Sequence, residues 1–337
     1  MLAPLCTALL VAAAAPQAAG DDPVVRHKSP AFGTVVEILA VAAPGSAAGT
    51  AGPFEAAFDE VRRIEALVDE ADARSPVARI NEAAGGAAVP IDPELFAVLS
   101  ELQRLAKVTK GAFDVTAAAY GTAWHFDERT EAVPLKKDVD KARELVGFDD
   151  LVLDPAARTA RLKTKGARIG VRAVARGHAL ERAAAVLEAK GVNDFVMTAA
   201  GDLIVRGQKG PRPWMVGIQD PRAAGHFAAL AAPASAVMTT GDYESFFFDG
   251  GVRYHNVIDP RTGQPASKCR SVTVVAKNAL TAEGLSRAVF VLGAKDGLAM
   301  IERLKGVDAI VVTSDNKVVL SRGLKNTLQH RPPTDGP

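Results

Sequence analysis

This sequence of 337 residues is poor in cysteine and in aromatic residues, and it carries almost no net charge. Its two cysteines, Cys6 and Cys269, predict no internal disulfide and show no spacing with histidine that is typical of a metal site. The aromatic share of 5% argues against a surface that stacks nucleic-acid bases. A formal net charge of +1 gives no bulk attraction to nucleic acid or to an anionic membrane. We therefore predict no nucleic-acid partner.

Residues 1–20 form an apolar run followed by small residues, as in the hydrophobic and cleavage regions of a secretory signal. The run has no basic residue ahead of it and is too short for a comfortable transmembrane helix. We predict export to the periplasm or cell envelope and no transmembrane span. The alternative is an Ala-rich leader with no targeting role.

The rest of the chain is expected to form one domain over residues 21–325 and a loose polar tail over residues 326–337. Apolar residues at three- and four-residue spacing predict helices over residues 54–72, 92–110, 139–146, 178–189, 282–292 and 295–304. Short apolar runs predict strands over residues 33–41, 214–218, 236–239, 252–258, 271–276, 309–313 and 318–320, a strand over residues 195–205 that is interrupted at residues 200–202, and a hairpin over residues 151–162 around Asp154-Pro155. Because these elements mix without a steady βαβ alternation, we predict an α+β fold.

A turn at Gly111-Ala112-Phe113-Asp114 follows one predicted helix. Small residues there let a ligand approach the backbone closely, Phe113 offers an apolar ring and Asp114 offers an acceptor. The alternative is a helix C-cap with Phe113 in the core.

Two further segments could hold an anion or a ligand. Arg176 precedes Gly177 and the predicted start of a helix at His178. A basic residue at a helix N-terminus suits a phosphate, although a solvated loop explains the same pattern. Asp202 follows Gly201, which interrupts a predicted strand where a bulge or a close ligand approach is expected.

A second turn, residues 259–263, follows the pair His255-Asn256. His255 could act as an acid or base near neutral pH, and its alternative is a structural role in a strand. Farther on, Glu283 and Ser286 could supply oxygen ligands to Mg²⁺. Arg287, one turn later, would repel a cation at close range or replace one.

Taken in order, these segments resemble the ApbE-like FAD:protein FMN transferases, and the resemblance covers about residues 30–325. It begins with Phe32-Gly33-Thr34 and the stretch from Ser75 to Asn81, and it continues through Gly-Ala-Phe-Asp, Arg-Gly-His-Ala, Ala-Gly-Asp and Asp-Pro-Arg-Thr-Gly. It implies the family's α+β fold, in which mixed and antiparallel sheets pack with helices and a flavin cleft lies between two lobes.

The resemblance also implies an activity. FMN would move from FAD to a threonine of a target flavoprotein, with Mg²⁺ on the pyrophosphate and AMP as the leaving group. The implied flavin-binding residues are Phe32, Ala112, Phe113, Asp114, Arg176, Asp202 and Val257. The implied metal-binding residues are Ala173, Glu283 and Ser286, and the implied catalytic position is Asn256 with His255 beside it.

Many positions depart from the family pattern, Phe32, Ala173 and Arg176 among them, and three departures bear most on the chemistry. Asn256 stands where the family has histidine, Glu283 replaces an aspartate that binds the metal, and Arg287 replaces a threonine ligand. An amide takes up no proton at neutral pH, so general-base help at residue 256 is lost unless His255 supplies it. The Arg287 guanidinium could neutralise pyrophosphate charge in place of Mg²⁺. The alternatives to a transferase are therefore a protein that binds flavin without transferring it, a scaffold that has lost flavin, and an enzyme that hydrolyses FAD with a metal ion.

Overall fold

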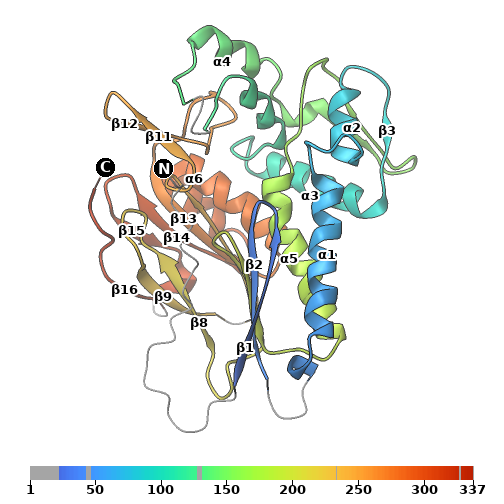
Figure 1. Cartoon of the computed structure of the whole chain (residues 1–337). Coiled ribbons are helices and arrows are strands. Elements are labelled where there is room, and N and C mark those ends of the chain that lie inside the picture. The colour runs from blue at the N-terminus through green and yellow to red at the C-terminus, as the bar shows by residue number, and fades with distance from the viewer. Residues whose placement is uncertain (1–22, 43–46, 127–130, 233, 326–327, 337) are drawn as a thin grey trace.

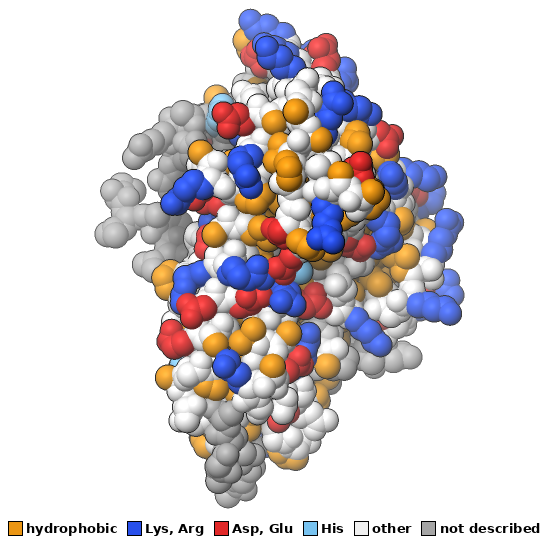
Figure 2. Space-filling view, turned by 90° about the vertical axis from the view of Figure 1, so that its right-hand side faces the viewer, with side chains coloured by type: hydrophobic (Ala, Val, Ile, Leu, Met, Phe, Trp, Pro, Cys, Tyr) orange, Lys and Arg blue, Asp and Glu red, His pale blue; other side chains and the backbone are white. Residues whose placement is uncertain are grey.

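A computed structural model describes residues 23–42, 47–126, 131–232, 234–325 and 328–336. The predicted signal over residues 1–20 lies outside this part of the chain. Within it, every helix is too short or too polar to cross a membrane. Lysine, arginine and acidic side chains are interspersed over the face in Figure 2, as the near-zero net charge leads one to expect.

An eight-stranded sheet in which every neighbouring pair is antiparallel forms the centre of the molecule (Figure 1). Its order is β1 (Val24–Ala31), β2 (Thr34–Val41), β6 (Phe195–Ala199), β7 (Asp202–Arg206), β10 (Ser235–Gly241), β13 (Cys269–Ala276), β14 (Val307–Thr313) and β15 (Val318–Leu320). Alternate residues of β2 point to opposite faces, so Ile38 joins one apolar cluster and Leu39 the other. Both faces of the sheet are therefore buried.

Helices cover one face of this sheet, and a small sheet covers the other. The helices are α1 (Gly52–Val68), α2 (Pro76–Glu82), α3 (Pro93–Val108), α4 (Lys136–Arg143), α5 (Arg172–Ala189) and α6 (Ala279–Ile301), and α1, α5 and α6 contribute most to the first cluster. Asp92 caps α3 by accepting from the amides of Glu94 and Leu95. Gly293, with φ 82°, kinks α6 and explains why two helices were predicted there.

The start of α5 corrects a prediction. The helix was expected to begin at His178, but it begins at Arg172, so Arg176 lies in its second turn. Its first amides, of Val171 and Arg172, donate to the Glu70 carboxylate at 2.5 and 3.0 Å. This carboxylate satisfies the helix N-terminus that was expected to attract an anion. Gly177 serves close packing, because a Cβ there would lie 3.3 Å from the Ala279 Cβ.

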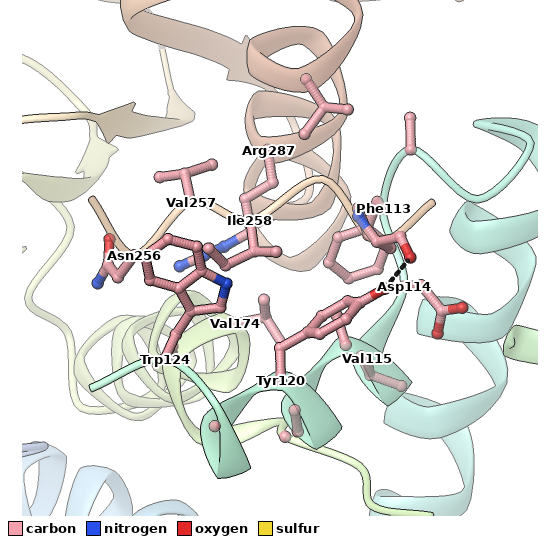
Figure 3. A pocket seen from close by; sticks show the side chains of 18 of the residues that line it. Phe113, Asp114, Val115, Tyr120, Trp124, Val174, Asn256, Val257, Ile258 and Arg287 are labelled. Carbon is pink, nitrogen blue, oxygen red and sulfur yellow. Dashed lines mark hydrogen bonds between the residues drawn. The ribbon is translucent and has the colours of Figure 1, made fainter. Parts of the chain in front are cut away.

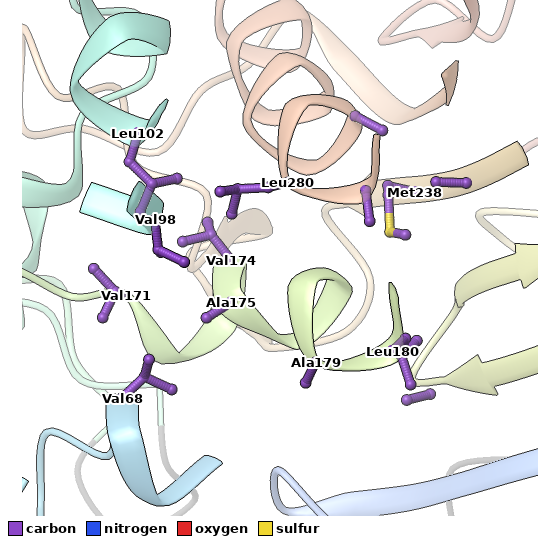
Figure 4. Packing of buried hydrophobic residues seen from close by; sticks show 14 of the residues in the cluster. Val68, Val98, Leu102, Val171, Val174, Ala175, Ala179, Leu180, Met238 and Leu280 are labelled. Atoms are coloured by element: carbon purple, nitrogen blue, oxygen red, sulfur yellow. The ribbon is translucent and has the colours of Figure 1, made fainter. Parts of the chain in front are cut away.

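Packing around α5 explains how these helices are held together. Val174 of α5 lies between Val98 of α3 and Leu280 of α6, and Leu180 lies toward the sheet near Met238 of β10 (Figure 4). All five side chains belong to the first apolar cluster. Because α5 touches α1, α6 and β7, it fixes the positions of the elements that surround the candidate site.

The remaining strands form three small sheets. They are β8 (Trp214–Gln219) and β9 (His226–Ala232) with β16 (Leu328–His330), β11 (Phe246–Asp249) with β12 (Val252–His255), and β3 (Val89–Pro90) with β5 (Thr159–Leu162) and β4 (Leu151–Asp154). The loose tail predicted from residue 326 is wrong for the residues described there. Strand β16 pairs with β9, Leu328 is buried in the second cluster, and Thr334 donates to Asp220.

The described residues also form four short 3₁₀ helices: η1 (Ala47–Gly49), η2 (Val115–Thr122), η3 (Phe148–Asp150) and η4 (Arg322–Leu324). Figure 1 shows α4 and the β11–β12 hairpin at one end of the layered body. The aromatic side chains of Tyr120, Trp124 and Phe247 pack together at this end, where they join η2 and its C-terminal flank to β11. This third apolar cluster adjoins the candidate site.

Candidate functional site

A cavity of about 370 Å³ lies where η2, the segment after β12 and α6 meet (Figure 3). This volume falls within the usual range for small-molecule sites. The lining is mostly apolar and aromatic, with a few polar groups at Glu70, Asp114, Asn256 and Arg287. Of the residues predicted for the site, the fold brings six to this cavity: Ala112, Phe113, Asp114, Ala173, Asn256 and Val257.

The first wall is the turn after α3. Lys110 and Gly111 have φ angles of 54° and 75°, and the Gly111 amide donates to Ala106 O at 2.8 Å. The turn is therefore a helix C-cap and a cavity wall at once, which unites the two interpretations of its sequence. Asp114 caps η2, because its Oδ1 accepts from the amide and the hydroxyl of Thr116 at 2.8 and 2.7 Å. Burial raises the pKa of Asp114 above its usual range.

The second wall is the segment from Asn256 to Pro260, and the turn that follows ties it to η2. Tyr120 donates its hydroxyl to Pro260 O at 3.0 Å, and Trp124 donates Nε1 to Gly263 O at 2.8 Å. These two bonds link segments about 140 residues apart in the chain. The two signature turns that the sequence singled out therefore face each other across one cavity.

His255 lies outside this cavity. Its side chain is 4% exposed and its ring meets Phe290 edge to face. Nε2 lies 2.8 Å from the Ala266 carbonyl, and the Val257 amide donates to Nδ1 at 3.2 Å. A carbonyl only accepts and an amide N–H only donates, so the ring is neutral with its proton on Nε2. Burial also lowers the pKa of His255. The structure therefore places Asn256, and no imidazole from residue 255, at the cavity.

Helix α6 presents Arg287 and Val291 to the cavity, whereas Glu283 and Ser286 are buried and are not among the residues that line it. Arg287 Nε donates to Glu283 Oε1 at 3.0 Å, while Glu283 Oε2 is buried without a hydrogen-bond partner in the described part of the chain. Ser286 Oγ lies 2.6 Å from Thr240 Oγ1 and donates to Glu283 O. The hydroxyl of Ser286 is thus turned toward the sheet.

Three other predicted residues lie away from the cavity lining. Arg176 and Asp202 form a buried ion pair, with 2.6 Å between Nη2 and Oδ2. Burial raises the pKa of both Asp202 and its neighbour Glu244. Ala200 and Gly201, with φ angles of 46° and 86°, form the tight turn between β6 and β7, where a bulge was one expectation.

Phe32 is the third predicted residue that lies away from the cavity lining. Its side chain is buried, its amide donates to Glu65 at 2.7 Å, and Arg172 lies over its ring. These contacts give Phe32 a structural part at the β1–β2 turn, where its φ is 52°.

Several lining residues were not found from the sequence. Tyr120, Trp124 and Phe126 supply the aromatic part of the lining, and Glu70 supplies a carboxylate. The Trp124 and Phe126 rings stack with 5.7 Å between centroids. A concentration of rings near residue 124, in a chain with 5% aromatic residues, was the available signal. No sequence signal marks Glu70, because the backbone amides that donate to its carboxylate lie about 100 residues away in the chain.

Comparisons with known proteins point to one family. The model of the ApbE family matches residues 32–311. A protein of Treponema pallidum named FAD:protein FMN transferase is 30% identical over 288 residues, which cover 80% of this chain and 80% of that protein. A protein of the same name from Rhodobacter capsulatus is 31% identical over 249 residues, and the match spans 73% of this chain but only 47% of that relative.

Solved structures agree with the sequence comparisons. The crystal structure of the ApbE protein from Thermotoga maritima superimposes with a TM-score of 0.82 at 29% identity, covering 90% of this chain and 98% of that one. The structure of the flavinyl transferase ApbE from Pseudomonas stutzeri gives a TM-score of 0.78 at 27% identity, covering 92% of this chain and 98% of that one. The α+β fold predicted from the sequence is confirmed.

Proposed function

This chain belongs to the ApbE family, and we propose that it binds FAD in the cavity and transfers FMN to a threonine of a target flavoprotein. The observation that supports this most directly is the meeting of the two signature turns, residues 111–114 and 256–263, across a cavity of ligand size. The relatives from Treponema pallidum and Rhodobacter capsulatus are named for FMN transfer from FAD to a protein, which supports this activity.

The lining suits the two halves of a flavin nucleotide. Tyr120, Trp124 and Phe126 offer flat apolar surface to an isoalloxazine ring. Arg287 offers a planar, permanently charged guanidinium to phosphate oxygens. Val257, which is buried and lies next to Asn256, belongs to the same wall, and its amide and carbonyl are held by His255 Nδ1 and by the Ala266 amide.

In the proposed transfer, a threonine hydroxyl of the target forms a bond to the phosphorus on the FMN side of FAD. The bond between that phosphorus and the bridging oxygen breaks, and AMP leaves with the oxygen and its electron pair. The hydroxyl proton passes to solvent, because Asn256 cannot hold it. Arg287 stabilises negative charge on the phosphoryl oxygens as the bond order changes.

A second candidate function, flavin binding without transfer, is favoured by Asn256. The carboxamide lies at the cavity where a general base would be useful, and both ring nitrogens of His255 are engaged by backbone groups. Loss of general-base help typically lowers a rate by about 10²- to 10⁴-fold. The loss of a general base would lower the transfer rate but leave the affinity for flavin unchanged.

One experiment separates the two functions. The purified chain is incubated with FAD and a target protein that carries an acceptor threonine, and a threonine-to-alanine target serves as the control. A fluorescent band on the threonine target alone supports transfer. Bound flavin with no labelled target supports binding without transfer. If the chain leaves flavin fluorescence unquenched, both proposals fail.

The composition of residues 1–20 supports export, so we place the target outside the cytoplasm. Cell fractionation, combined with N-terminal sequencing of the protein recovered from the periplasm, tests this placement. Recovery of the uncleaved chain in the cytoplasm alone would contradict it.

A further inference from the structure

The side chains near α6 do not form the Mg²⁺ site that the family resemblance implies. Mg²⁺ prefers near-octahedral oxygen ligands. The Ser286 hydroxyl is fully buried against Thr240, and one oxygen of Glu283 already accepts from Arg287. Among the described residues, no three His, Cys, Asp or Glu side chains are grouped so that they could hold a metal ion. Two carboxylate oxygens here are buried without a hydrogen-bond partner in the described part of the chain, Glu283 Oε2 and Asp202 Oδ1. Each belongs to a carboxylate that is already paired with an arginine, so they are too few for a coordination shell.

A permanent positive charge, the Arg287 guanidinium, already lies beside Glu283. Arg287 Nε is held by Glu283 Oε1, and the terminal nitrogens have no hydrogen-bond partner among the described residues. Figure 3 shows the side chain reaching from α6 into the cavity toward Trp124. The Arg287 side chain is 29% exposed, so its terminal nitrogens remain accessible to a ligand. Two parallel N–H groups match the oxygens of a phosphate.

The Glu283 carboxylate holds the Arg287 guanidinium in place. The positive charge of Arg287 in turn disfavours the binding of a second cation. Glu283 is almost fully buried, so its negative charge needs a partner at close range, and Arg287 supplies it. Arg176 adds a second buried guanidinium next to Asp202. A divalent ion brought beside Glu283 would meet the repulsion of Arg287, which lies within hydrogen-bond distance of the same carboxylate.

We propose that Arg287 is the resident cation of this site and that the chain binds the pyrophosphate of FAD without Mg²⁺. This inference rests on the proposed binding of FAD in the cavity. It assigns the neutralisation of phosphate charge, which the family resemblance gives to a metal ion, to a side chain of the protein itself.

The first test uses the wild-type chain. FAD is titrated in EDTA and, separately, in MgCl₂, and quenching of flavin fluorescence reports binding. The expected dissociation constants agree within about twofold, less than a single hydrogen bond contributes. Binding that requires Mg²⁺ would overturn the inference and leave the proposed function standing. If FAD binds in neither buffer, the proposed function itself fails.

The second test replaces the guanidinium. Arg287→Thr should weaken FAD binding in EDTA by about 10- to 100-fold, the effect of losing a charge-assisted hydrogen bond. Its affinity for riboflavin, which carries no phosphate, should be unchanged, and this also shows that the variant is folded. Equal FAD affinity in Arg287→Thr and wild type would overturn the inference.

Two further variants sharpen this test. Arg287→Lys keeps the charge but lacks the planar fork, so its FAD affinity should fall between the other two. Arg104→Thr breaks a comparable Arg–Glu pair on α3, with 2.7 Å between Nε and Glu101 Oε2, away from the cavity lining. It should bind FAD as the wild type does. If Arg104→Thr weakens binding as much as Arg287→Thr, net charge alone explains the effect and the assignment to Arg287 is wrong.

Discussion

Replacement of Gly263 by alanine should disrupt the second wall of the cavity. Gly263 has a φ of 74°, a conformation that residues with a Cβ adopt only with strain. A Cβ placed there would lie 2.6 Å from Tyr120 Cε1 and 2.6 Å from Val139 Cγ1. Both neighbours are buried and belong to the third apolar cluster, so neither can move aside without disturbing its own packing.

Two costs add in this variant. A left-handed backbone at a residue with a side chain costs about 1–3 kcal/mol. Overpacking of a filled core costs about a further 1–3 kcal/mol. We therefore expect Gly263→Ala to lower the free energy of unfolding by about 2–6 kcal/mol and to weaken FAD binding, since the Asn256–Pro260 wall moves with the turn.

The matched control is Gly250→Ala, at the tip of the β11–β12 hairpin. Gly250 also has a positive φ, 55°, but a Cβ added there would meet no heavy atom within 4 Å. This variant should carry the backbone cost alone. Urea unfolding followed by tryptophan fluorescence measures both variants, and flavin quenching measures their FAD affinity. Equal destabilisation of the two variants would refute the packing of Gly263 against Tyr120.

Three further predictions concern residues in the Asn256–Pro260 wall or in contact with it. Asn256→His should raise the rate of FMN transfer by supplying a general base, but by less than the usual factor of about 10² to 10⁴, because the nearby charge of Arg287 disfavours the imidazolium ion; target fluorescence measures the rate, and an unchanged rate would mean that proton removal does not limit transfer. Tyr120→Phe should lower the free energy of unfolding by about 1 kcal/mol through loss of its bond to Pro260 O, and a loss near zero in urea titrations would argue against that bond. Because burial lowers the pKa of His255 below its unfolded value of about 6.5, its contribution to stability is present above that pH and is lost as the pH falls. His255→Gln should flatten the fall in unfolding free energy between about pH 7 and pH 5, and equal slopes in variant and wild type would contradict this.

The layered part of the fold could be predicted because its signals are local. The apolar spacing of α1 and α3, and Asp92 ahead of Pro93, mark helices whose buried faces match the prediction. Strand β9 was missed, since its sequence, His226–Ala232, is rich in alanine and alanine is not typical of strands. This segment forms a strand because the side chains of Phe227 and Leu230 are buried in the second apolar cluster.

The site was harder to predict, because contacts between distant segments decide it. The start of α5 depends on Glu70, which the sequence of α5 cannot reveal. His255 and Asn256 illustrate a second difficulty. His255 ends β12 and its ring is held by the Ala266 carbonyl and the Val257 amide, whereas Asn256 follows the strand and lines the cavity. The sequence named both as candidates, and only the packing of His255 against Phe290 separates them.

The side chains of Asn256 and Arg287, two positions at which the family resemblance implies other residues, suit each other physically. Both side chains line the same cavity. A histidine at residue 256 would have to accept its proton near the permanent charge of Arg287, and a neighbouring positive charge disfavours an imidazolium ion. A neutral carboxamide avoids that repulsion and still offers hydrogen bonds to phosphate oxygens. With Arg287 as the resident cation, Asn256 is therefore the more compatible neighbour, and the two departures describe one rearranged phosphate site.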